Sequence, residues 1–163
     1  MATVDVSNGI NAGTHPSRAI RKEPYKVEVD LDFAVATTTK GSDLAAADVL
    51  QVIDVPAKTM VWAAGFEVVT PPNGDASADI GITAVDVDAF VDGFTLDSTS
   101  TGDMTNLPAA YQPQVVASDD TIDMLILAGS SAAPSTGVVR MWAVMQDVSN
   151  DLGPDEVDRD QLA

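Results

Sequence analysis

A long stretch of alternating side chains, residues 25–36, constrains the fold of this chain more than any other feature of its sequence. Apolar residues occupy every second position from Val27 to Val35, and charged residues fill most of the positions between them. Successive side chains of a β-strand point to opposite faces of a sheet, so a period of two indicates a strand with one buried face. The stretch predicts a strand over Tyr25–Ala36 whose apolar side faces the core.

Further segments of this kind follow, each bounded by turn-forming residues. Pro56 closes one of them, and Pro71-Pro-Asn-Gly74 closes another. The predicted strands are Val49–Val55, Thr59–Thr70, Ser77–Thr83, Thr121–Ala128 and Val138–Val148. Ser42–Asp48 favours a short helix, and residues 97–111 favour a loop. Many short strands separated by turns predict an all-β fold, an antiparallel β-sandwich or jelly-roll-like single domain.

Charge is distributed unevenly along the chain. The 163 residues carry 25 acidic against 8 basic side chains, a net charge of −17, and the pI is about 4.1. Arg18, Arg21 and Lys22 lie in a basic N-terminal segment that shows no strand pattern. A basic segment on an acidic body is typical of an arm that lies outside the core. We therefore expect an extended N-terminal arm over 1–24, a β-sandwich over 25–148, and an acidic C-terminal tail over 149–163.

Composition argues against several classes of function. An acidic surface repels phosphates, which disfavours nucleic acid or an anionic membrane as the main partner. No apolar run approaches the roughly 20 residues of a membrane helix, and no signal-peptide pattern begins the chain, so we expect a soluble protein made in the cytoplasm. The absence of cysteine rules out disulfides and thiolate metal sites, and a single histidine, His15, disfavours a catalytic triad.

Carboxylates supply the candidates for a metal or hydrolytic site. Residues 75–92 are rich in Asp, and Asp86 and Asp88 would share one face of a strand, although their spacing differs from that of an EF-hand loop. Asp119 and Asp120 form a pair of the kind used in acid–base hydrolysis. Because Asp is so frequent here, such pairs arise by chance, and the sequence contains no phosphate-binding loop or nucleophile elbow. We expect no enzyme activity, no cofactor and no metal.

Large apolar side chains in the predicted strands are expected to fill the core. The aromatic residues of this set are Phe33, Trp62, Phe66 and Trp142, and the methionines are Met60, Met124, Met141 and Met145. The aliphatic residues expected to be buried are Val27, Val29, Leu31, Val61 and Val144. A carbohydrate-binding protein would instead present its aromatic residues at the surface, so the position of the two tryptophans separates two kinds of function.

The order of turns and strands from Asp48 to Gly93 resembles that of small structural proteins of tailed-phage virions. The matching features are the turn Val55-Pro-Ala-Lys-Thr59, the Val-rich strand after it, Asn73–Ser77, Asp79-Ile-Gly81 and Asp86–Gly93. Lys58 stands where a glycine is frequent, which affects only the turn geometry. The resemblance implies a capsid decoration (cement) protein or head fibre. Such proteins are non-enzymatic and often trimeric, and a decoration protein binds the major capsid protein on the outer surface of the virion.

Two other hypotheses stand beside capsid decoration. A receptor- or glycan-binding module of a head fibre or tail would expose Trp62 or Trp142, and a calcium-dependent hydrolase would depend on Asp86 or Asp88. For a decoration protein the arm is the candidate interface. We expect Arg18, Arg21 and Lys22 to contact acidic groups on the shell or on an adjoining subunit, since Arg binds carboxylates in a bidentate manner.

Overall fold

The fold is described by a computed structural model that covers residues 3–5, 23–96, 99–105, 112–127 and 133–149. Its strands are β1 (Thr3–Asp5), β2 (Tyr25–Asp32), β3 (Val49–Val55), β4 (Thr59–Thr70), β5 (Ser77–Ile82), β6 (Asp86–Thr95), β7 (Gln114–Val116), β8 (Asp120–Ile126) and β9 (Val138–Asp147), and its helix is α1 (Phe33–Lys40). The bounds of β3 and β4 are those predicted from the sequence. No helix in these ranges is long and apolar enough to cross a membrane.

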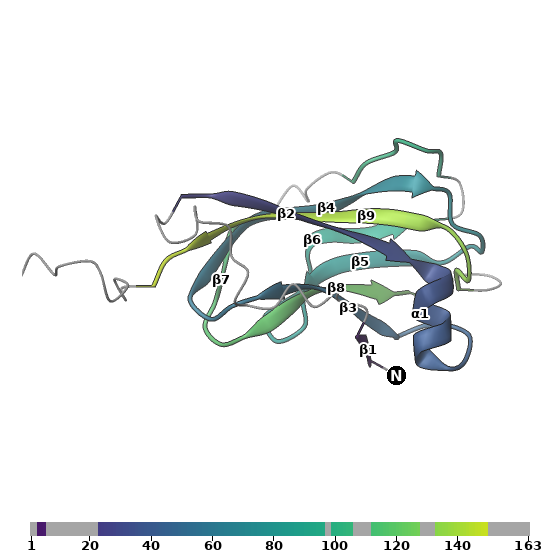
Figure 1. Ribbon diagram of the computed structural model, residues 1–163, viewed down its shortest axis with the longest axis horizontal. Coiled ribbons are helices and arrows are strands. Elements are labelled where there is room, and N and C mark those ends of the chain that lie inside the picture. The colour runs from purple at the N-terminus through teal and green to yellow at the C-terminus, as the bar shows by residue number, and fades with distance from the viewer. Residues whose placement is uncertain (1–2, 6–22, 97–98, 106–111, 128–132, 150–163) are drawn as a thin grey trace, which may run out of the picture.

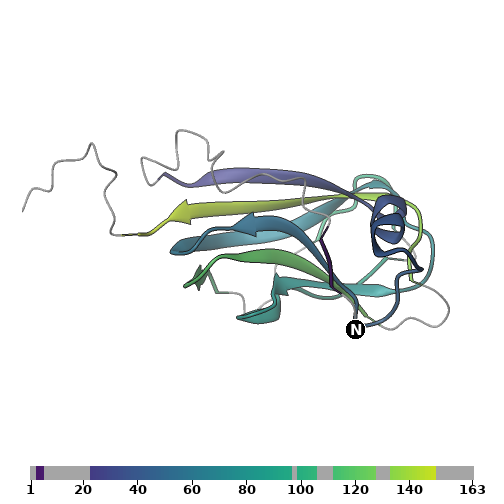
Figure 2. The same ribbon diagram turned by 60° about the horizontal axis from the view of Figure 1, so that its bottom comes forward.

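Two sheets form a β-sandwich, as the sequence predicted. The strand order is β1-β3-β8-β5-β6 in the five-stranded sheet and β2-β9-β4-β7 in the four-stranded sheet. In Figure 1, β2, β9 and β4 lie toward the top and β3 and β8 toward the bottom. Figure 2 shows α1 closing one end of the sandwich, where the chain passes from β2 in one sheet to β3 in the other. The described strand pairs are antiparallel except that β1 runs parallel to β3.

The core lies between the sheets and is filled by alternate side chains of each strand. In β9 the buried residues are Val139, Met141, Ala143 and Met145, which pair with Leu31, Val29, Val27 and Tyr25 of β2. Leu31, Phe33 and Val61 are buried as predicted, whereas Val27 is only partly buried. The prediction for Val144 was wrong. It is opposite Lys26, on the outward-facing side of the sheet, because its neighbours Ala143 and Met145 occupy the inward positions.

Strand β2 ends at Asp32, four residues before the predicted end at Ala36. The Asp32 carboxylate accepts hydrogen bonds from the backbone N–H groups of Ala34 (2.8 Å) and Val35 (3.4 Å) and so caps α1. Phe33 and Ala36 are buried, which is the spacing of a helix face, while Val35 is exposed. The apparent alternation through Phe33 and Val35 therefore concealed a strand-to-helix boundary.

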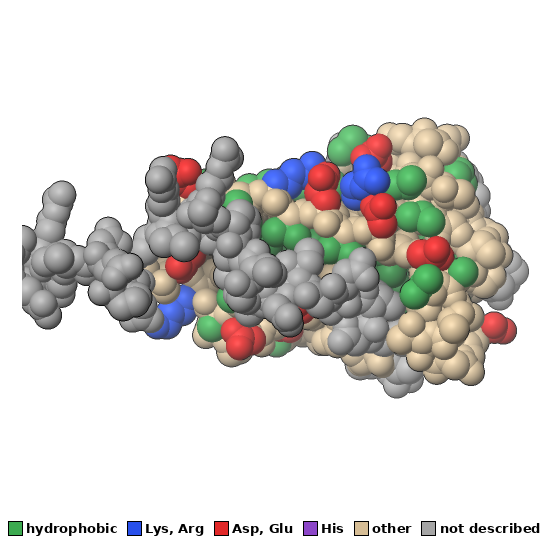
Figure 3. Space-filling view, in the orientation of Figure 1, with side chains coloured by type: hydrophobic (Ala, Val, Ile, Leu, Met, Phe, Trp, Pro, Cys, Tyr) green, Lys and Arg blue, Asp and Glu red, His purple; other side chains and the backbone are tan. Residues whose placement is uncertain are grey.

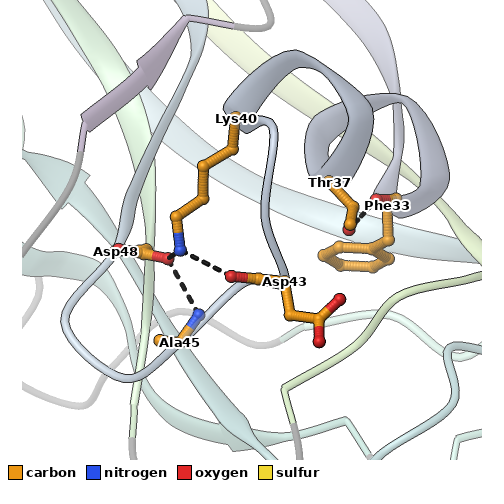
Figure 4. Close-up of polar contacts among 6 residues, drawn as sticks. All are labelled: Phe33, Thr37, Lys40, Asp43, Ala45 and Asp48. Atoms are coloured by element: carbon orange, nitrogen blue, oxygen red, sulfur yellow. Dashed lines mark hydrogen bonds and ion pairs between the residues drawn. The ribbon is translucent and has the colours of Figure 1, made fainter.

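The predicted helix over Ser42–Asp48 is also wrong, because a turn anchored by an ion pair occupies these residues. Gly41 ends α1 in the left-handed conformation (φ 77°), and Ala47 is left-handed as well (φ 68°), which a continuing helix does not allow. Lys40 Nζ donates to Asp48 Oδ2 (2.5 Å) and to the Asp43 carbonyl (2.6 Å), as Figure 4 shows. Asp48 Oδ2 also accepts from Ala45 N (2.8 Å). These bonds fix the connection from α1 to β3.

Besides β1, the sequence did not predict strands β6 and β7. Strand β6 pairs with β5 through two register shifts, which interrupt the alternation that identifies a strand. At its start the backbone of Asp86 and Val87 packs against Gly81, where a Cβ atom would collide with it. Strand β7 contributes only Gln114–Val116 to the edge beside β4. A segment this short carries too little pattern to be detected.

Asn73, in the turn between β4 and β5, fastens that turn to the segment before β9. Its Oδ1 accepts from the backbone N–H groups of Ser135 (2.7 Å) and Thr136 (2.9 Å), and its Nδ2 donates to Ser135 Oγ (3.0 Å). The Asn73 backbone N–H donates to the Thr136 carbonyl (3.2 Å). Both connections are thereby held together at one end of the sandwich.

Candidate functional site

The arm residues predicted to form an interface, Arg18, Arg21 and Lys22, lie outside the described residues. The arm nevertheless contains one element that was not anticipated. Thr3–Asp5 forms β1, which pairs in register with Val49–Gln51 of β3. Part of the predicted arm therefore belongs to a sheet of the body.

The fold places the aspartates of residues 75–92 in different surroundings. Asp79 lies in β5, is buried, and accepts from the Gly93 N–H (2.7 Å). Burial raises its pKa, partly offset by that hydrogen bond. Asp86 and Asp88 are exposed near the start of β6, and the main cause of the raised pKa of Asp88 is the hydrogen bond that its protonated carboxyl donates to Asp86. In the described part of the chain, no three acidic or histidine side chains are placed to hold a metal ion.

The second carboxylate pair is committed to backbone contacts. Asp119 Oδ1 accepts from Ala57 N (2.8 Å), and Asp120 Oδ1 accepts from Thr121 N (2.9 Å). Each of these bonds stabilises a turn or a strand end. The arrangement therefore gives the pair a structural role in the turn that leads into β8.

Asp123 is a further enclosed carboxylate, outside these pairs. It lies in the middle of β8 and is 3% exposed. Thr121 Oγ1 donates to its Oδ1 (2.5 Å), and Thr83 Oγ1 donates to its Oδ2. Burial raises the pKa of Asp123, and the two threonine hydrogen bonds oppose that rise. Because both oxygens are engaged within the chain, this carboxylate is a structural group of the five-stranded sheet.

The outer face of the four-stranded sheet carries an apolar patch, and four of its five members had been predicted from the sequence to lie in the core. We call it the outer-sheet patch, and it consists of Met60, Trp62, Val115, Trp142 and Val144. Trp62 is 41% exposed and Val115 is 50% exposed. Strand pairing brings the members together, since Met60 is opposite Val115, and Val144 is opposite Ala63, next to Trp62. The predictions of core positions for Trp62 and Trp142 were wrong, while those for Phe33 and Phe66 are confirmed.

The two tryptophans of the patch are held in different ways. Trp62 Nε1 donates to Gln146 Oε1 (2.9 Å) on the neighbouring strand, which orients its exposed ring. Trp142 lies over Gly65, its cross-strand partner, where a Cβ atom would be 3.1 Å from the ring and would collide with Thr105 Oγ1. The Trp142 indole N–H is enclosed, and no described residue accepts a hydrogen bond from it. Gly65 thus provides the space in which the Trp142 ring packs against the sheet.

Charged residues flank the patch on the same face. Arg140 forms a two-point contact with Asp30, from Nε to Oδ1 (2.8 Å) and from Nη2 to Oδ2 (3.3 Å). This contact raises the pKa of Arg140. Lys26 pairs with Glu28 at 2.5 Å. Figure 3 shows apolar, basic and acidic side chains interleaved over the region of β2, β9 and β4. A face that carries an exposed tryptophan, an oriented arginine and a polar rim is typical of protein-binding surfaces.

The comparisons with known proteins concern the fold alone. Neither a protein-family model nor a curated protein matches the sequence. Among solved structures, a chain in the capsid of Ralstonia phage GP4 matches with a TM-score of 0.60 and 15% identity, over 89% of this chain and 99% of that one. A chain in the cyanophage Pam1 capsid asymmetric unit matches with a TM-score of 0.54 and 13% identity, over 76% of this chain and 84% of that one. The protein therefore shares its β-sandwich fold with chains of two phage capsid structures.

Proposed function

We propose that this protein is a structural component of a phage virion. The observation that carries the proposal is the likeness to the chain in the Ralstonia phage GP4 capsid, which covers almost the full length of both proteins. An independent line of support is the resemblance of the turns between Asp48 and Gly93 to those of small virion proteins. Fold alone does not determine function, and the surface of the molecule supports a more specific role.

Within the virion, we assign the chain to decoration of the shell. A decoration protein, acting as an oligomer, binds the major capsid protein on the outer surface and stabilises the assembled state by mass action, without catalysis. A net charge of −17 keeps such a protein soluble before it attaches. The outer-sheet patch offers an apolar contact surface in an otherwise acidic body. These properties suit a protein that acts through shape and surface.

The outer-sheet patch is the proposed contact with the shell. Tryptophan and arginine contribute disproportionately to protein interfaces because they bury large areas and make directed contacts. The Trp62 ring and the Arg140 guanidinium are each held by a neighbouring side chain, so little rotational freedom is lost when they bind. Preorganisation of this kind favours attachment without a change of fold.

Purified particles test the proposed function. The protein should copurify with particles at a fixed high copy number, comparable to that of the shell protein, in quantitative mass spectrometry. Absence from the particles would contradict the proposal. Removal and re-addition of the protein should lower and then restore the temperature at which the shells release their genome.

Co-sedimentation with undecorated particles tests the contact surface. Val115→Asp and Trp62→Ala should each weaken binding at least tenfold. Val35→Asp is the matched control, because Val35 is 56% exposed but lies on α1, away from the patch. Binding that is equal for Val115→Asp and Val35→Asp would remove the patch from the interface.

The arm residues are tested separately. Charge reversal at Arg18 and Arg21 should weaken binding most at low salt, where screening is least. This pair of substitutions leaves β1 in place, whereas deletion of residues 1–24 would also uncover the edge of β3. Unchanged binding at low salt would mean that the arm residues do not contribute and that the sandwich alone attaches to the particle.

The exposure of Trp62 also favours a second function, a receptor- or glycan-binding module of a head fibre or tail. An exposed indole ring is the kind of surface against which sugar rings stack. This function predicts binding of the isolated protein to a glycan array, lost in Trp62→Ala. An array without signal, together with retained particle binding, would leave decoration as the function.

A further inference from the structure

The first strand of the chain is attached to the body in an unusual way. β1 is 3 residues long and pairs in parallel with β3, as Thr3 opposite Val49, Val4 opposite Leu50 and Asp5 opposite Gln51. It forms the edge of the five-stranded sheet. Parallel neighbours cannot be joined by a tight turn, so β1 reaches its place through a long connection.

The β3 edge is a surface that must be covered. Val49 and Leu50 are buried, and the sequence of β3 is largely apolar and β-branched. An uncovered edge of this composition is a template for pairing with another chain. The described β1 pairing covers the Val49–Gln51 part of that edge. A strand supplied in this register is therefore required, whichever copy of the chain it comes from.

The connection to β2 is longer than the placement requires, even though it must run back along the 8 residues of β2, about 25 Å, to reach Tyr25. Residues 6–24 can span on the order of 60 Å when extended. Neighbouring strands are about 4.8 Å apart, and packed sheets about 10 Å apart. Closing a long loop costs entropy, and a three-residue strand returns few hydrogen bonds. β1 of a second copy would make the same contacts with β3, in the same register.

Charge favours the second copy. Residues 1–24 hold three basic and two acidic residues, while the rest of the chain holds 5 basic and 23 acidic residues, from totals of 8 and 25. A positive arm is attracted to the acidic body of a neighbour, and its attachment relieves repulsion between two acidic bodies. We infer that the β3 edge is a strand-acceptor site for β1 of a second copy, so that subunits of the oligomer exchange N-terminal strands.

Cysteine pairing tests strand exchange cleanly because the chain has no cysteine of its own. An Asp5→Cys chain and a Gln51→Cys chain, carrying different C-terminal tags, are co-expressed, purified together and oxidised. Each chain has one thiol, so the two cannot form a disulfide within one molecule. Exchange should give a mixed disulfide dimer as the main product on a non-reducing gel. Thr3→Cys with Val49→Cys, the other outer pair in register, provides a second test should the first pair fold poorly.

The matched control replaces Gln51→Cys by Asp92→Cys. Asp92 is exposed on β6, at the opposite edge of the same sheet. A mixed dimer in similar yield with this control would indicate random collision and overturn the inference. A chain carrying both Asp5→Cys and Gln51→Cys that forms only an internal disulfide, with no mixed dimer from the single variants, would also overturn it. The readout needs no particles, so its outcome is independent of the proposed function.

Discussion

Lys40 and Asp48 form a nearly buried ion pair that joins the end of α1 to the start of β3, with Nζ 2.5 Å from Oδ2 and side-chain exposures of 13% and 3%. Removing one partner leaves a carboxylate enclosed without its counter-charge. We expect Lys40→Met to lower the free energy of unfolding by about 3 kcal/mol, measured by urea denaturation. Lys26→Met is the control, because the Lys26–Glu28 pair is about half exposed and should change stability by less than about 0.5 kcal/mol. Equal losses in the two variants would show that the enclosed Lys40–Asp48 pair contributes no more to stability than the exposed Lys26–Glu28 pair.

Phe33 begins α1 with its ring fully buried. Phe33→Ala should lower the free energy of unfolding by about 3–5 kcal/mol, since it removes a large apolar group and leaves a cavity. Val35→Ala, two residues along but exposed, should change stability little. Chemical denaturation of both variants checks the expectation, and a near-neutral Phe33→Ala would mean that the ring does not hold the end of the sandwich closed.

Asp123 and Asp79 make stability depend on pH. Burial raises the pKa of both carboxyls in the folded state above the ordinary value of 3.8. Between the ordinary pKa and the raised one, the folded state binds more protons than the unfolded state. Stability therefore rises as pH falls from neutrality through the raised pKa, and levels off below the ordinary one.

Thermal unfolding at about pH 7.5 and about pH 5 measures this dependence. Asp123→Asn should reduce the gain in melting temperature on acidification. Asp43→Asn, at an exposed residue, removes the same charge and corrects for the general relief of repulsion. A gain that is the same in both variants would mean that Asp123 contributes nothing to it.

Gly65 lies beneath Trp142, and Thr105 Oγ1 donates to the Phe66 carbonyl and accepts from Phe66 N at the same place. Gly65→Ala forces the added methyl group against that hydroxyl. We expect a loss of about 1–3 kcal/mol and a change in Trp142 fluorescence. A variant with unchanged melting temperature and fluorescence would show that the segment at Thr105 shifts freely.

Calcium should have little effect on stability. Within the described ranges no cluster of ligands is present, and Asp79, Asp119 and Asp120 are engaged with backbone N–H groups. The melting temperature should differ by only a few degrees between excess chelator and added calcium. A large stabilisation would place a cation in the acidic stretch, because a ligand that binds only the folded state raises its stability.

The sandwich could be predicted because most of its strands carry two independent signals in the sequence, an apolar pattern and turn-forming residues at their ends. β3 and β4 combine an apolar pattern with proline-rich ends, and both were placed at their true bounds. β6 lacked the first signal because its register shifts break the alternation. The end of β2 was misplaced because Phe33 and Val35 extend the period of two, although Asp32 is a good helix cap.

The outer-sheet patch was harder to predict for a physical reason. Hydrophobicity indicates that a side chain avoids water, but it does not indicate whether the chain's own core or a partner covers it. Trp142 and Val144 flank Ala143, and only the pairing of β9 with β2 and β4 decides which of these residues faces inward. A β-bulge in β4 between Val61 and Ala63 also shifts the alternation of inward-facing and outward-facing side chains, which makes the side of the sheet on which Trp62 lies harder to predict.

The hydrogen bonds of Asn73 also bear on how the protein ages. Asparagine followed by glycine is prone to deamidation, in which the Gly74 nitrogen attacks the Asn73 side-chain carbonyl and releases ammonia. Here the carbonyl oxygen accepts two backbone N–H groups and the amide nitrogen donates to Ser135. Attack requires the side chain to rotate away from all three contacts, so mass spectrometry of the stored protein should find less conversion at Asn73 than in a Ser135→Ala variant. Folding thus protects the Asn73-Gly74 turn from a reaction that its sequence favours.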